Sequence, residues 1–321
     1  MNRKSRIIAT FFILAIFLLN EKALSWEANP THKDLSLNAA RKSILSEAKG
    51  DYLKNLGFEK GLEEPLTWGE KTSIVEWWLQ EGSALEDKWW GDEGIGFRCR
   101  NHFHNPLKNK DGGPWGEWDS AGLNDFFSGM PALLWAQDRT KQSAYPEGDW
   151  TWQEARDRYY LALTSNTNDE RQENFARTFR ALGHQLHLVQ DMAVPAHVRN
   201  DAHPLRFSKA GGLHIEKWAA KKENRPTVNS YATSPESPSI YLNKDITYKG
   251  EKLVPITQFT DIDEYDGSNP STSLSIGLAE YTNANFFSDD TIFAAEIYQP
   301  GHRHYFPNPK KSDTNVPVSY T

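Results

Sequence analysis

The helical pattern over residues 170–192 constrains the fold of this chain more than any other feature. Apolar side chains recur there every three or four residues, so one face of the helix would meet a core. These side chains are Phe175, Phe179, Leu182, Leu186 and Val189. Pro195 follows and predicts that the helix ends or turns there, because proline has no backbone N–H to donate.

Other segments show helical periodicity, and the sequence as a whole predicts an all-α protein with long loops. We expect one domain over residues 26–298. Within it, residues 88–120 are expected to form a loop, and residues 225–272, rich in Pro, Ser, Asn and Thr, a long surface excursion with only short strands. Residues 299–321 are expected to be a C-terminal tail. The further expected helices span residues 34–49, 70–86, 150–164, 215–224 (ending before Pro226) and 273–296.

The N-terminus has the layout of a signal peptide. A basic segment at residues 2–6 precedes the apolar run at residues 7–19, and Ala23 and Ser25 supply small residues before a cleavage point. We therefore predict cleavage after Ser25 and a secreted or periplasmic protein whose mature chain begins at Trp26. The apolar run is short for a membrane span, and an uncleaved anchor is the alternative.

Charge and cysteine content narrow the function classes. The formal net charge is −7, and removal of four basic residues and one acidic residue with the signal peptide lowers it to −10. An acidic chain has no overall attraction for nucleic acid, although metal ions can reverse the local charge of a site. Cys99 is the only cysteine, so stability must come from packing or metal. We interpret Cys99 as a free buried thiol and not as a nucleophile.

Histidine and carboxylate residues gather in the stretch "GHQLHLVQDMAVPAH", residues 183–197. His187 and Asp191 are four residues apart and so project from one helical face, a spacing that suits one metal ion. His197 follows Pro195 and would approach from another direction. His184 lies on the same face as His187. The alternative is a helix whose polar face happens to carry histidines.

Two further stretches repeat this composition. Glu86 and Asp87 end an expected helix, with His102 and His104 in the loop that follows. His214 and Glu216 lie close together before Trp218. Each stretch alone is weak, but three of them in an exported chain without disulfides predict a metalloprotein.

The chain resembles the zinc-dependent phospholipase C family in three features taken together. They are the pattern H-x-x-x-D-x-x-x-P-x-H, the "NHFHNP" loop and a Trp at the mature N-terminus. The single-strand-specific zinc nucleases share the fold of this family. The resemblance covers residues 26 to about 220. It implies an all-α bundle around about three zinc ions, one of them bound by the amine and carbonyl of the N-terminal Trp. It further implies a site formed by Trp26, His32, Asp87, His102, His187, Asp191, His197, His214 and Glu216.

The resemblance also assigns roles within that site. Trp26 and His32 would bind one zinc, His102 and His187 another, and Asp191 would bridge the two. His197, His214 and Glu216 would bind the third. Asp87 would bind metal or act as the general base.

The third site departs from the family, which has H-x-x-x-E where this chain has His214-x-Glu216. Residues two apart on a helix point to opposite sides. Both can bind only if His214 precedes the helix, and His203 is the spare candidate. His104 and His184 have no ligand counterpart in the family, and we expect them to pack behind the ligands.

The expected activity is hydrolysis of phosphate diesters by metal-activated water, with a phospholipid at a membrane interface as the preferred substrate. The "NHFHNP" loop and the aromatics Trp89, Trp90 and Phe97 favour this choice. A single-strand nuclease, in which aromatics stack bases, is the first alternative. A zinc-binding protein of the same fold without turnover is the second. We infer no protein partner.

The expected role of Trp26 can be tested at the N-terminus. An added residue before Trp26 turns its amine into an amide nitrogen, a very poor ligand, so we expect one zinc to be lost and activity to fall by at least about tenfold. Trp26→Phe keeps the amine and should cost far less. Elemental analysis and N-terminal sequencing of both variants check this, and equal zinc content in the extended and native chains would refute the role.

Overall fold

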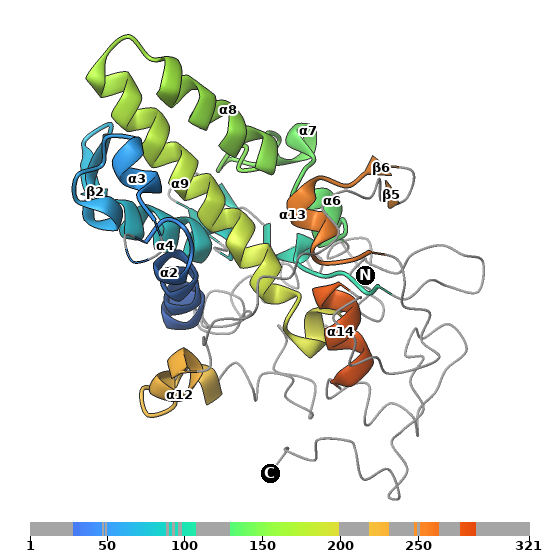
Figure 1. Cartoon of the computed structure of the whole chain (residues 1–321). Helices are drawn as coiled ribbons and strands as arrows, with labels where there is room; N and C mark the ends of the chain where they lie inside the picture. The colour runs from blue at the N-terminus through green and yellow to red at the C-terminus, as the bar shows by residue number, and fades with distance from the viewer. Residues whose placement is uncertain are drawn as a thin grey trace, which may run out of the picture.

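The computed structural model of this chain is mostly helical (Figure 1). Three two-stranded antiparallel sheets lie within the part of the chain that it describes. Trp26, His203, His214, Glu216, the predicted signal peptide and the predicted tail lie outside that part. The described residues are 28–46, 48, 50–87, 90–91, 94–95, 98–106, 129–198, 218–230, 247–248, 251–262 and 277–286.

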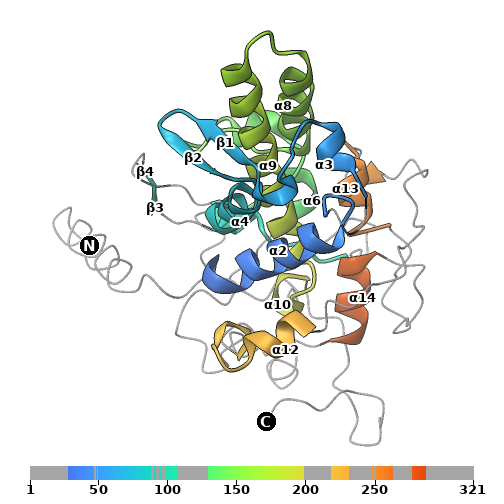
Figure 2. The same ribbon diagram turned by 60° about the vertical axis from the view of Figure 1, so that its left-hand side comes forward.

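Helix α9 (Asn168–Asp191) runs through the centre of the fold (Figures 1 and 2). The side chain of Thr167 accepts a hydrogen bond from the Glu170 backbone N–H and so caps its start. Phe175 and Phe179 are buried, as their spacing predicts. Pro195 opens the short helix α10 (Pro195–Val198), which changes the chain direction. The expected helix over residues 170–192 is confirmed.

Two helices flank α9. Helix α8 (Trp152–Thr164) forms an antiparallel hairpin with it, and α4 (Val75–Glu86) crosses it (Figure 1). Helix α2 (Lys33–Lys42) packs against α4, where the hydroxyl of Ser36 bonds that of Ser83 at 2.9 Å. These four helices form the frame on which the histidine and carboxylate side chains are placed.

The crossing of α4 and α9 is a close backbone contact at two glycines. A methyl group on Gly82 would lie 2.0 Å from the carbonyl oxygen of Arg180. A methyl group on Gly183 would lie 2.2 Å from the carbonyl oxygen of Leu79. Both distances are far below van der Waals contact, so only glycine permits this approach.

Several boundaries differ from the sequence expectation. Residues 70–74 are not helical: β1 (Pro65–Trp68) pairs with β2 (Lys71–Ile74), and α4 begins only at Val75. The turn between the strands uses Gly69 at φ +57°, a left-handed conformation that favours glycine. Helix α2 ends at Lys42 and not at residue 49.

The expected loop over residues 88–120 contains a short hairpin, β3 (Trp90–Gly91) with β4 (Gly94–Ile95), followed by the 3₁₀ turn η3 (Arg98–Asn101).

The expected helix over 215–224 is also predicted wrongly at its C-terminal end. Residues 218–220 are helical, but α12 (Arg225–Ser230) starts where the prediction stopped. Proline suits the first turn of a helix, so Pro226 begins a helix here and does not end one.

The expected excursion over 225–272 is partly core. Strands β5 (Thr247–Tyr248) and β6 (Glu251–Lys252) precede α13 (Pro255–Gln258). Leu253 and Ile262 are buried against Met192. Helix α14 (Leu278–Asn285) lies within the expected helix over 273–296. The remaining short elements are η1 (Ala28–His32), α3 (Tyr52–Asn55), η2 (Gly61–Glu63), α6 (Ala132–Trp135) and α7 (Arg139–Gln142).

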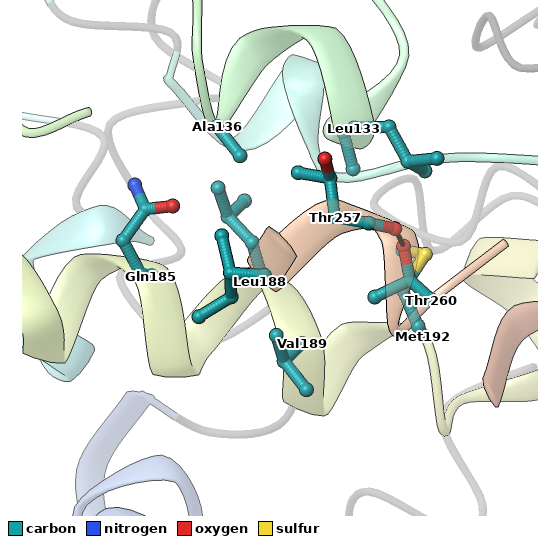
Figure 3. Close-up of a pocket in the computed structure, with 10 residues that line it drawn as sticks. Leu133, Ala136, Gln185, Leu188, Val189, Met192, Thr257 and Thr260 are labelled. Carbon is teal, nitrogen blue, oxygen red and sulfur yellow. Dashed lines mark hydrogen bonds between the residues drawn. The ribbon is translucent and has the colours of Figure 1, made fainter. Parts of the chain in front are cut away.

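Helices α6, α9 and α13 enclose a small apolar pocket between Leu133, Leu188 and Thr257 (Figure 3). Its volume is about 10 Å³, which is at most the space of one water molecule. This pocket is therefore a packing gap and too small for a substrate. None of the helices in the described residues is long and apolar enough to cross a membrane.

The helix crossing generates the first structural prediction. Gly183→Ala forces α4 and α9 apart, so we expect a loss of about 1–3 kcal/mol or more in the free energy of unfolding, despite the higher helix propensity of alanine. Arg156→Ala, at an exposed position of α8, is the control and should change stability by less than about 0.5 kcal/mol. Urea unfolding measures both, and a Gly183→Ala variant as stable as the native chain would show that the crossing can relax.

Candidate metal centre

Buried histidines and carboxylates meet at the C-terminal end of α9. His187 and Asp191 project from one face of this helix, His32 ends the π-helical turn η1, and His102 follows η3. Asp191 Oδ2 lies 3.0 Å from His102 Nδ1 and 3.1 Å from His187 Nε2. Asp191 Oδ1 lies 3.5 Å from His32 Nε2. The carboxylate of Asp191 thus stands between histidines from three separate parts of the chain.

Two overlapping groups of these side chains could each hold a metal ion. One consists of His32, His187 and Asp191, and the other of Asp87, His102 and His187. Within each group the ligand atoms lie within 4.8 Å of one another, and every member is buried. Five of the residues expected to bind metal are therefore together in the structure.

His197, the sixth described candidate, lies on α10. Its Nδ1 is 3.7 Å from Asp191 Oδ2 and bonds the backbone carbonyl of His102 at 3.0 Å. The structure therefore puts His197 beside the same carboxylate. Its expected companions His214 and Glu216, the spare candidate His203, and Trp26 lie outside the described residues.

The hydrogen bonds of three histidines determine which ring nitrogen carries the proton. His187 Nδ1 lies 2.6 Å from the carbonyl oxygen of Ser83, and His32 Nδ1 lies 2.6 Å from Gln190 Oε1. Because these oxygens only accept, each Nδ1 must donate, as must Nδ1 of His197. In a neutral ring Nε2 then keeps a lone pair. Metal-binding histidines are oriented in this way.

The buried charges are strongly coupled. Burial alone would raise the pKa of Asp191, but His197, His187 and His102 outweigh it and hold this pKa well below its usual range. Burial lowers the pKa of His32 far below its usual value, and His187 adds to this effect. Burial also disfavours a charged His102, yet the hydrogen bond to Asp191 and the nearby carboxylates of Glu86 and Asp87 raise its pKa to about 10. A metal ion binding here would displace the proton from His102.

Asp87 is brought to this cluster by the end of α4. It is the C-cap residue of the helix and is only 4% exposed. Its Oδ1 lies 3.6 Å from His102 Nδ1. The C-terminus of a helix disfavours a negative charge nearby, so a cation beside Asp87 would relieve an unfavourable placement.

Sequence reasoning named Glu86 but did not place it in the site. Its carboxylate is fully buried and lies 3.6 Å from His102 Nε2. A signal for it does exist in the chain. Val75, Leu79, Gly82 and Glu86 recur at helical spacing on the buried face of α4, so Glu86 occupies a core position.

The remaining candidates take supporting positions. His184 bonds Glu86 through Nδ1 and stacks on Trp150, with ring centroids 5.0 Å apart. His104 bonds Asp261 at 2.6 Å. Both histidines thus contact carboxylates other than Asp191, and the expectation that they pack behind metal ligands stays a prediction.

Cys99 is a free thiol and half-buried. Burial and the charge of Asp87 raise the pKa of its thiol well above the usual value. A raised pKa disfavours the thiolate that a nucleophile needs. The expectation of a buried thiol is met only in part, because Cys99 is half-buried.

Comparisons with protein-family models, with curated proteins and with solved structures found no match to this chain. What can be said of its function therefore comes from its own residues.

The position of Asp191 leads to a prediction on metal content. Because this carboxylate faces histidines of both groups, Asp191→Ala should remove more than one equivalent of bound metal, whereas His32→Ala should remove one. Asp169→Asn changes an exposed carboxylate in the first turn of the same helix and should leave the content unchanged. Elemental analysis after dialysis measures all three. Equal metal content in Asp191→Ala and Asp169→Asn would rule out the arrangement.

Proposed function

We propose that this protein is a zinc-dependent hydrolase of phosphate diesters with the fold of the zinc-dependent phospholipase C family. The observation that carries the proposal is the arrangement around Asp191. His32, His102 and His187, from three parts of the chain, each turn one ring nitrogen toward its carboxylate. The other ring nitrogen of His32 and of His187 is hydrogen-bonded to an oxygen of the protein.

The donor set suits zinc. Imidazole nitrogen and carboxylate oxygen are ordinary zinc ligands, whereas calcium and magnesium prefer oxygen alone. His102, His187 and Asp87 would bind one ion, and Trp26 would join His32 at the next. Asp191 would bridge these two ions. His197 would bind a third with Glu216 and either His214 or His203.

Bound zinc would lower the pKa of a water molecule and neutralise the charge of a phosphate diester. The chain supplies the rest. Asp87, on the last turn of α4 and 3.6 Å from His102, would accept the proton of the attacking water. His187 and Asp191 share the rigid end of α9, which fixes the relative positions of the ligands.

A phospholipid is the substrate class we favour. The net charge of −10 that remains after removal of the predicted signal peptide works against a polyanionic nucleic acid. Signal cleavage would place the enzyme outside the cytoplasm, where lipid surfaces are accessible. A nuclease and a zinc protein without turnover are the outcomes that would contradict this choice.

Activity assays separate these functions. The zinc-loaded mature chain should release the phosphorylated head group from phosphatidylcholine vesicles and leave single-stranded DNA intact. Asp87→Asn should lower the rate by about 10²–10⁴-fold, the usual contribution of a general base. Asp157→Asn, at a partly exposed position of α8 that pairs with Arg139, is the control. Cleavage of DNA alone would identify a nuclease, and zinc binding without turnover on either substrate would indicate the non-catalytic protein.

A further inference from the structure

The carboxylate of Glu86, at the end of α4, accepts hydrogen bonds from three buried side chains. Its Oε2 accepts hydrogen bonds from Arg98 Nε at 3.0 Å and Nη2 at 2.9 Å, and another from His184 Nδ1. Its Oε1 accepts one from Trp135 Nε1 at 2.6 Å. All four side chains are at least 99% buried. These donors leave the carboxylate no freedom to turn.

The charged partner of this carboxylate is also held in place. Arg98 Nη2 lies 2.9 Å from Glu86 Oε2, in an ion pair whose two side chains are fully buried. Arg98 is fixed in turn, since its Nη1 bonds the carbonyl of Gly148 and its Nη2 bonds Gln142 Oε1. The ion pair of Glu86 and Arg98 is therefore fixed from both sides.

Glu86 faces the side of His102 that points away from the metal cluster. Glu86 Oε1 lies 3.6 Å from His102 Nε2, whereas His102 Nδ1 lies 3.0 Å from Asp191 Oδ2 and 3.6 Å from Asp87 Oδ1. One imidazole ring thus stands between Glu86 on one side and the two candidate ligands on the other.

We propose that Glu86 is a positioning residue that keeps the proton of His102 on Nε2 and thereby directs the lone pair of Nδ1 to the metal. The inference rests on the metal-binding part of the proposed function. A carboxylate behind a metal-bound imidazole fixes its tautomer and ring orientation and makes the other nitrogen a better ligand. His32 and His187 are oriented by neutral oxygens, so His102 alone of these three would have a charged partner.

A purely structural role explains less of the geometry. A buried ion pair such as Glu86 with Arg98 is weak as a source of stability, because both charges lose their hydration. Glu86 lies one residue before Asp87 and against His102. This position is explained if Glu86 holds the proton of His102 in place. Trp135 and His184 add donors that fix the carboxylate in that position.

The test measures the tautomer of His102 and the zinc affinity in the full-length mature chain. Long-range ¹H–¹⁵N NMR of the zinc-loaded protein distinguishes the protonated ring nitrogen from the metal-bound one, and the His102 signals are those missing from His102→Gln. We expect Nε2 to carry the proton in the native chain. Glu86→Gln should weaken one zinc equivalent by about 10–100-fold in chelator competition and change the His102 signals.

Glu76→Gln is the matched control. Glu76 lies on the same helix and also pairs with an arginine, Arg41, at 2.8 Å, so this variant should keep the native affinity and the native His102 signals. If circular dichroism shows that Glu86→Gln is unfolded, Glu86→Asp takes its place. Aspartate keeps the charge for Arg98 but draws the oxygen back from His102, and it should weaken the same zinc equivalent.

The outcomes separate the two proposals. A native chain that binds no zinc refutes the proposed function. If the native chain binds zinc, two results would refute only the positioning role. One is a proton on His102 Nδ1 in the native chain. The other is a folded Glu86 variant whose zinc affinity and His102 signals are unchanged.

Discussion

The close crossing of α4 and α9 is the contact on which the rest of this structure depends. Gly82 and Gly183 let the two backbones approach to a distance that a single methyl group would prevent. As a result the carbonyl of Ser83 reaches His187 Nδ1, and the C-terminal end of α4 brings Glu86 and Asp87 to the face of α9 that carries His184, His187 and Asp191. A wider crossing would separate the carboxylates from the histidines.

That crossing also concentrates charged side chains in the buried interior of the fold. Glu86, Asp87 and Asp191 are all buried, and buried carboxylates are costly unless they are paired. Arg98 compensates Glu86, while Asp87 and Asp191 share the proton-bearing ring of His102. A divalent cation would compensate these charges better than one proton does, so metal binding and folding stability should be linked in this protein.

The sequence predicted the features whose cause is local. The helix over 168–191 follows from apolar spacing within one segment, and so does the pairing of His187 with Asp191 on one face. The hairpin over residues 65–74 was missed, because its two strands are short and its polar residues resemble a helix start. Pro226 was misread because proline stops a helix from within and begins one at its first turn.

The sequence by itself determined which ligand types are available and that His187, Asp191 and His197 stand near one another along the chain. The family resemblance named His32 as a ligand, but only the tertiary structure brought it, 158 residues before its partner Gln190, to the same cluster. The tertiary structure likewise placed Glu86 3.6 Å from His102. The physical reason is that residue spacing fixes side-chain directions only within one helix. Which helix faces then meet depends on packing. Here it depends on Gly82 and Gly183, and the spacing of residues along the chain does not show how closely these glycines let the two helices approach.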